Sequence, residues 1–119
     1  MAGTTRAEER RSVFARIARY DVPPEELEET INAFREAGAS LQELEGMIGG
    51  YLLVDPEEGT TISLTLWETQ RLLEASQTRA ASLRRRAVQT GGGSVQSVAN
   101  YEVALEFGGH TRDLREDEA

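Results

Sequence analysis

Arg16 and Trp67 are the side chains whose types and positions best suit chemistry on a bound molecule. Arg16 lies in a segment that alternates like a β-strand, with the same parity as Phe14 and Tyr20. A guanidinium in a strand that can be buried needs an acceptor, because an unpaired buried charge is costly. The acceptor is either a carboxylate of the same sheet, such as Glu102, or an anionic oxygen of a ligand.

Trp67 shares its strand parity with three hydroxyl side chains, those of Thr61, Ser63 and Thr65. We expect this face to lie opposite the apolar set of the same segment, which is predicted to pack on the helices and consists of Ile62, Leu64 and Leu66. A surface that mixes an indole with hydroxyls suits a planar, partly polar ligand. The alternative is that Trp67 closes one end of the core without touching a ligand.

The composition excludes several classes of chemistry. All 13 positive side chains are Arg, Cys is absent and His110 is the single His. A Schiff-base lysine, a thiolate nucleophile, a disulfide, a sulfur-ligated metal and a multi-His metal centre are therefore impossible. The acids lie mostly on expected helix surfaces or near the chain ends, so we expect no metal site.

The charge balance bears on partners and location. The 21 acids against 13 Arg give a net charge of -8, which argues against nucleic acid and anionic membrane as partners. The one basic run, Arg84 to Arg86, is expected to close a helix, where cations complement the carbonyl end of the dipole. No apolar stretch approaches the roughly 20 residues of a membrane span. We expect a soluble cytoplasmic protein.

The hydrophobic period changes regularly along the chain. Strands are predicted where it is two and helices where it is near 3.6. The predicted elements are a strand over 13–20, a helix over 24–37 with an extra turn over 40–45, strands over 47–54 and 60–67, a helix over 69–88 capped by Thr69, and a strand over 95–107. Residues 1–12 and 108–119 are expected to be mobile tails, the second one acidic, around a single domain over 13–107.

The order β-α-β-β-α-β predicts an α+β fold of the ferredoxin-like type. It has a four-stranded antiparallel sheet with both helices on one face. The helix-free face, expected to carry Phe14, Tyr20 and Trp67, is too apolar to stay in water. We therefore expect a homodimer that forms through the sheet faces.

Four stretches of sequence also carry a family resemblance. They are Phe14-Ala15-Arg16, Gly49 to Asp55, Ser63 to Thr69, and Tyr101-Glu102-Val103. Together they resemble the dimeric α/β-barrel superfamily, in particular its antibiotic-biosynthesis-monooxygenase-like members. The resemblance implies two facing four-stranded sheets, with a pocket in each chain between its own sheet, helices and loops. The superfamily includes oxygenases that need no metal or flavin, haem-degrading enzymes and proteins that only bind small molecules.

On that resemblance we expect a cofactor-independent monooxygenase-like protein acting on a small aromatic metabolite of the phenol or quinol type. The alternative is a non-catalytic binding or structural dimer of the same fold. The candidate catalytic residues are Arg16, Trp67 and Asn100; the candidate substrate-binding residues are Phe14, Tyr51, Ser63, Thr65 and Tyr101. The haem-degrading members need a His on the second helix, and residues 69–88 contain none. Haem chemistry is therefore not expected.

Overall fold

The predicted βαββαβ order is present in the computed structural model, which describes residues 13–108. The elements are β1 (Phe14–Asp21), the 3-10 turn η1 (Pro24–Glu26), α2 (Leu27–Leu41), β2 (Met47–Val54), β3 (Thr60–Trp67), α3 (Gln70–Ala75), α4 (Gln77–Thr90) and β4 (Ser94–Glu102). The strands form one four-stranded sheet in the order β2-β3-β1-β4, with antiparallel neighbours. The ferredoxin-like fold is thus confirmed. The expected tail over 1–12, all but the first residue of the expected tail over 108–119, and His110 lie outside the described residues.

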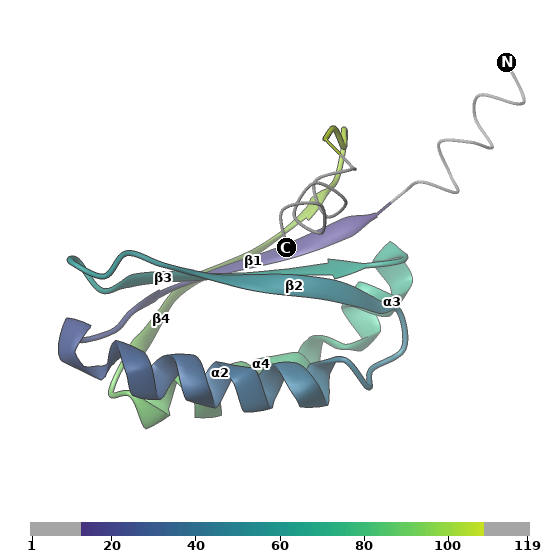
Figure 1. Cartoon of the computed structure of the whole chain (residues 1–119). Helices are drawn as coiled ribbons and strands as arrows, with labels where there is room; N and C mark the ends of the chain where they lie inside the picture. Colours follow the sequence, from purple (N-terminus) through teal and green to yellow (C-terminus); the bar gives the residue numbers. More distant parts are fainter. Residues whose placement is uncertain (1–12, 109–119) are drawn as a thin grey trace, which may run out of the picture.

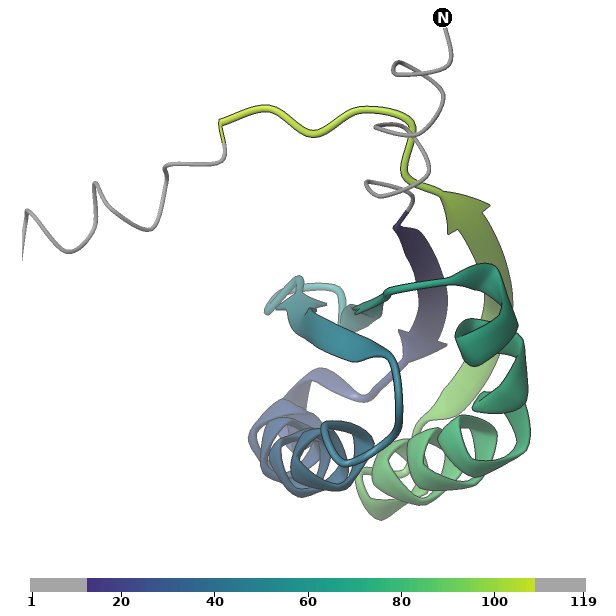
Figure 2. The same cartoon turned by 90° about the vertical axis from the view of Figure 1, so that its right-hand side faces the viewer.

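Both long helices cover the same face of the sheet (Figure 1). In the view turned by 90°, α2 and α4 lie side by side beneath a sheet that curves over them (Figure 2). The core joins the two layers: Tyr20 and Val22 pack with Leu27 and Val88, and the Tyr20 ring lies 5.2 Å from that of Phe34. Within residues 13–108, none of the helices is long and apolar enough to cross a membrane.

The two faces of the sheet are the reverse of those predicted. Arg16, Tyr20 and Trp67 are buried on the helix side. Leu64, which pairs with Ile17, and its parity mates Ile62 and Leu66 lie on the helix-free side, so the prediction that they pack on the helices is wrong. Both faces carry many apolar side chains, and alternation then separates the faces without telling which one meets the helices.

The second predicted helix is divided at Ser76. Its predicted N-cap is confirmed, because Thr69 Oγ1 accepts a hydrogen bond from the backbone N–H of Leu72 at 3.1 Å. At the break, Ser76 Oγ donates to the carbonyl of Leu73 at 2.7 Å, and Arg16 Nη2 donates to the same carbonyl at 2.9 Å. Arg16 of β1 therefore donates a hydrogen bond to a backbone carbonyl of α3, close to the position where α3 ends and α4 begins.

Two other boundaries differ from the sequence prediction. The helix α2 continues through Gly38 to Leu41, because Leu41 still packs against the core formed by Ala37 and α4. The strand β4 ends at Glu102 rather than at residue 107. Residues 103–108 have no regular secondary structure: the Val103 N–H still donates to the Val13 carbonyl at 2.7 Å, and Leu105 and Phe107 are 74% and 84% exposed.

Candidate functional site

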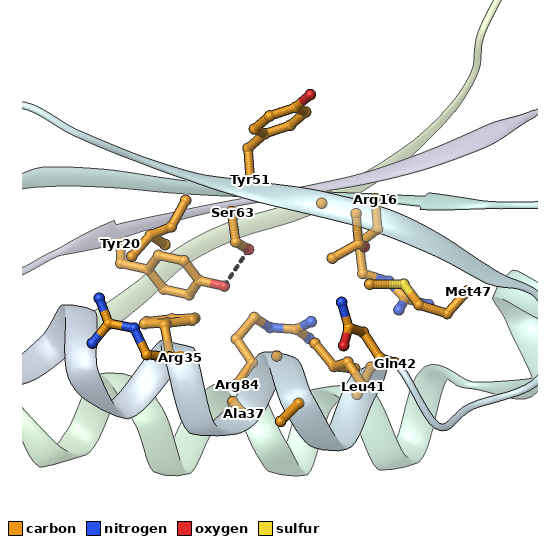
Figure 3. Close-up of a pocket in the computed structure, with 17 residues that line it drawn as sticks. Arg16, Tyr20, Arg35, Ala37, Leu41, Gln42, Met47, Tyr51, Ser63 and Arg84 are labelled. Atoms are coloured by element: carbon orange, nitrogen blue, oxygen red, sulfur yellow. Dashed lines mark hydrogen bonds between the residues drawn. The ribbon is translucent and has the colours of Figure 1, made fainter. Parts of the chain in front are cut away.

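A pocket of about 380 Å³ lies between the sheet and the two long helices (Figure 3). This volume is within the range of small-molecule sites, roughly 300–1,000 Å³. Its apolar wall comes mainly from α2 and β2 and comprises Phe34, Ala37, Leu41, Met47, Leu52 and Ala80. Its polar groups come from the sheet and both helices and are Arg16, Tyr20, Arg35, Gln42, Ser63, Thr65 and Arg84.

Arg16 enters the pocket from β1 with only 4% of its surface exposed. Its guanidinium donates to the Leu73 carbonyl at 2.9 Å and to Ser76 Oγ at 3.3 Å. Both acceptors are neutral, so of the two alternatives left by the sequence, a carboxylate of the same sheet is not the partner of Arg16 among the described residues; Glu102 lies opposite Phe14 in the β1–β4 register. Burial, and then the positive charge of Arg84, lower the pKa of Arg16.

Trp67 lies behind Arg16 rather than in the pocket wall. Its ring is fully buried, and its Nε1 donates to Thr65 Oγ1 at 2.9 Å. The Cζ atom of Arg16 lies 5.6 Å from the centre of the indole ring, within the range of a cation–π interaction. Trp67 is thus placed to hold the Arg16 guanidinium, and through its hydrogen bond it also orients Thr65, which lines the pocket.

Tyr20 and Ser63 form a hydroxyl pair on the sheet side of the pocket. Their oxygens are 2.7 Å apart, and either one can donate. Burial raises the pKa of Tyr20 to about 12, while the hydrogen bond between Tyr20 and Ser63 and the charges of Arg84 and Arg16 act in the opposite direction. Tyr20 therefore keeps its proton at neutral pH and serves as a neutral hydrogen-bonding group.

Arg84 is the site residue that sequence reasoning missed. It was expected to help close a helix, but α4 continues to Thr90 and Arg84 lines the pocket. A signal for it exists in the sequence: Arg84 lies four residues after Ala80 and four before Val88, both buried, and therefore on the inner side of the helix. Burial lowers the pKa of Arg84, and the neighbouring Arg85 contributes in the same direction.

The structure brings together only some of the predicted site residues. Arg16, Ser63 and Thr65 line the pocket. Asn100 pairs with Arg16 across β1 and β4 but is exposed, and Phe14 pairs with Trp67 at the end of β1; neither lines the pocket.

The two predicted tyrosines do not enter the pocket with their rings. Tyr51 borders it, but its ring points away to the other side of the sheet (Figure 3) and the residue is 67% exposed. Tyr101 pairs with Ala15 and also lies on the helix-free side, 54% exposed. We call this helix-free side of the sheet the open face; by strand register it consists of Ala15, Ile17, Arg19, Gly49, Tyr51, Leu53, Ile62, Leu64, Leu66, Ser97, Ala99 and Tyr101.

Comparisons with known proteins point to one family. The profile of the family described as antibiotic biosynthesis monooxygenase matches residues 13–87. The uncharacterized protein Rv2558 of Mycobacterium tuberculosis is 39% identical over 66 residues, which make up 56% of this chain and 28% of that protein. The chain thus matches less than a third of the length of this curated relative.

Solved structures share the fold at low sequence identity. SnoaB, a cofactor-independent oxygenase from Streptomyces nogalater, superposes with a TM-score of 0.61 at 12% identity, over 82% of this chain and 98% of that one. The heme-degrading protein Rv3592 from Mycobacterium tuberculosis superposes with a TM-score of 0.60 at 20% identity, over 82% and 97%. One of these two proteins is a cofactor-independent oxygenase and the other is a heme-degrading protein, so the fold alone does not identify the reaction.

Proposed function

The chain belongs to the antibiotic biosynthesis monooxygenase family, and from that premise we propose that it oxidises a small aromatic phenol or quinol with molecular oxygen, without metal or flavin. One observation carries the proposal: the pocket of about 380 Å³ combines an apolar wall with the guanidinium of Arg16. The cofactor-independent oxygenase with the same fold supports it.

The reaction balances without an external reductant. One oxygen atom of O2 enters the ring and becomes a quinone oxygen, while the other leaves as water. The substrate supplies all four electrons and both protons of that water. The protein therefore needs to bind the electron-rich phenolate, orient it and keep bulk water away.

The pocket residues fit these tasks. Arg16 stabilises the phenolate oxygen, because a fixed positive charge in a largely buried place lowers the pKa of a bound phenol. Tyr20 and Ser63 offer a neutral hydroxyl pair to a second ring oxygen. Phe34, Leu41 and the rest of the apolar wall enclose the ring. Trp67 acts on the reaction indirectly, by holding Arg16.

A homodimer through the open face is part of the same proposal. The open face exposes large apolar side chains, including Tyr51 and Leu53 at the β2 edge and Tyr101 on β4. A second copy of the sheet would cover them and also offer a contact for Leu105 and Phe107. Because the pocket lies on the other side of the sheet, each chain keeps its own pocket.

Binding without turnover is the second candidate function, and one observation favours it. Among the described residues that line the pocket, none is a carboxylate or a histidine that could accept the phenol proton. Turnover is therefore restricted to substrates that ionise near neutral pH once Arg16 is beside them.

Oxygen uptake with a panel of anthrones and naphthols tests the proposal. We expect consumption of one O2 per substrate, and one atom of labelled oxygen in the quinone when the gas is ¹⁸O2. The Arg16→Gln variant should lose this activity, and Arg19→Gln, on the open face, should keep it. If these compounds bind but oxygen uptake does not exceed the background rate, the oxygenase proposal is refuted and the second candidate function, binding without turnover, is supported.

A further inference from the structure

The pocket is positively charged although the chain as a whole is acidic. The sequence has 21 acids and 13 Arg, yet the described residues that line the pocket include Arg16, Arg35 and Arg84 and no Asp or Glu. Acidic residues are frequent nearby, on α2 and on the loop after β2, so their absence is specific to the described residues that line the pocket. A site with this composition is suited to an anion.

Among the described side chains that line the pocket, Arg84 has the most free hydrogen-bonding capacity. Within residues 13–108 its guanidinium forms no hydrogen bond and no ion pair, and its nitrogens stay accessible, because no fully buried side-chain nitrogen or oxygen of these residues lacks a partner. Arg16 uses N–H groups on the neutral acceptors Leu73 and Ser76. Arg84 thus has its whole five-donor fork available to a ligand, and Arg16 has only part of its own.

The two guanidinia approach the same part of the pocket from opposite layers, Arg16 from the sheet and Arg84 from α4 (Figure 3). Each is partly removed from water, and the charge of Arg84 acts on Arg16. Two like charges with no carboxylate between them repel one another in the free protein. An anion bound between them would turn this repulsion into two attractions.

We propose that the pocket selects hydroxyaryl carboxylic acids, with the carboxylate on Arg84 and the ionised ring oxygen on Arg16, and that Arg84 sets this selectivity. The inference rests on the proposed function for the use of the ring oxygen and adds the substrate class. A planar guanidinium with all its donors free matches a carboxylate in a two-bonded arrangement, which a neutral amide reproduces poorly. The aromatic ring then lies against the apolar wall, between Phe34 and Met47.

Calorimetric titration with two matched compounds tests the proposal. The probes are 4-hydroxy-2-naphthoate and 4-hydroxy-2-naphthamide, which share the ring and the phenol and differ in the charge of one group; the two substituents are meta, so no internal hydrogen bond raises the pKa of the phenol. We expect the carboxylate to bind at least about tenfold more tightly than the amide, as the greater strength of charged hydrogen bonds implies. Arg84→Gln should reduce this preference to about twofold or less by weakening carboxylate binding alone.

Arg85→Gln is the matched control. It removes the same charge from the next residue of α4, which is exposed and outside the pocket lining. We expect it to keep the tenfold preference. If both variants lose the same amount of carboxylate affinity, the preference comes from the net charge of the protein, and the assignment of the carboxylate to Arg84 is overturned. Equal affinity for the two compounds in the wild type, or binding of neither at millimolar concentration, would overturn the selectivity itself.

The outcome is separable from that of the oxygenase proposal, because binding requires no turnover. If the protein prefers the carboxylate in a way that depends on Arg84 but takes up no oxygen, this inference is supported and the oxygenase proposal is refuted. Oxygen uptake with neutral naphthols and no preference for the carboxylate would do the reverse.

Discussion

The Cζ atom of Arg16 lies 5.6 Å from the centre of the Trp67 ring, and Nη2 of the same guanidinium donates to the carbonyl of Leu73 at 2.9 Å. This pair joins the first strand, the third strand and the helix break at Ser76. Trp67 is the single tryptophan of the chain, so its fluorescence reports on the surroundings of Arg16.

Replacing Arg16 should separate function from stability. In Arg16→Met the lost hydrogen bonds are offset by removal of a buried charge that has no carboxylate partner, and Ser76 Oγ still donates to the Leu73 carbonyl. We expect the free energy of unfolding, from urea titration, to stay within about 1 kcal/mol of wild type. Oxygen uptake and naphthoate binding should be lost. A destabilisation above about 3 kcal/mol would make Arg16 a structural residue.

The Trp67–Thr65 hydrogen bond should contribute to stability through both partners. Trp67→Phe removes the Nε1 donor and part of a fully buried ring, which should cost about 1–3 kcal/mol. Thr65→Val removes the acceptor. Because the two changes delete one bond, the double variant should be less destabilised than the sum, by about 1 kcal/mol, in urea unfolding followed by circular dichroism. Strict additivity would show that this bond has no energetic role.

Tyr20 should make the folded protein sensitive to alkaline pH. Its folded pKa of about 12 lies above the usual tyrosine pKa of about 10, so the native state keeps a proton that the unfolded chain releases. The stabilisation is complete below about pH 10 and is lost as the pH rises toward 12, at up to about 1.4 kcal/mol per pH unit. Urea unfolding between pH 9 and about 12 measures the slope.

Tyr20→Phe is the control for this pH effect. The Phe ring keeps the apolar contact with Phe34 and has no proton to lose. The difference in unfolding free energy between wild type and Tyr20→Phe should therefore decline above about pH 10. A constant difference over that range would show that Tyr20 titrates normally.

The dimer proposal predicts a difference between two adjacent residues of β2. Leu53 lies on the open face, whereas Val54, paired with the buried Thr61, points to the helix side near the end of the strand. Leu53→Glu places a charge in the proposed interface and should give a monomer by light scattering after gel filtration. Val54→Glu adds the same charge and should remain dimeric. A monomeric wild type at micromolar concentration would refute the dimer.

The element order could be read from the sequence because the hydrophobic period switches cleanly between two and 3.6 along the chain. The orientation of the sheet could not. Thr61, Ser63 and Thr65 were expected on a ligand face opposite the helices. They lie on the helix side instead, where Ser63 and Thr65 line the pocket. Alternation defines two sets of side chains, and only tertiary packing decides which set meets the helices.

The candidate site was predicted in part for a similar reason. Arg16 was identifiable as a charge in a buried strand, and Ser63 and Thr65 follow from its face. Arg84 was not identified because it belongs to a run of three arginines that differ only in the side of the helix on which they lie. Arg85 and Arg86 are exposed, whereas Arg84 lies on the inner side, in line with the buried Ala80 and Val88. The side of the helix on which Arg84 lies could be predicted only if the helix was known to continue past the arginines, as α4 does to Thr90.

The contrast between a cationic pocket and an acidic chain also governs the kinetics of ligand entry. At a distance, an incoming anion meets the repulsion of a molecule with net charge -8. Only near the pocket does it meet the arginines. Salt screens the distant field over about 8–10 Å and affects the enclosed contacts much less. The association rate constant of an anionic ligand should therefore rise with ionic strength, the opposite of electrostatic steering.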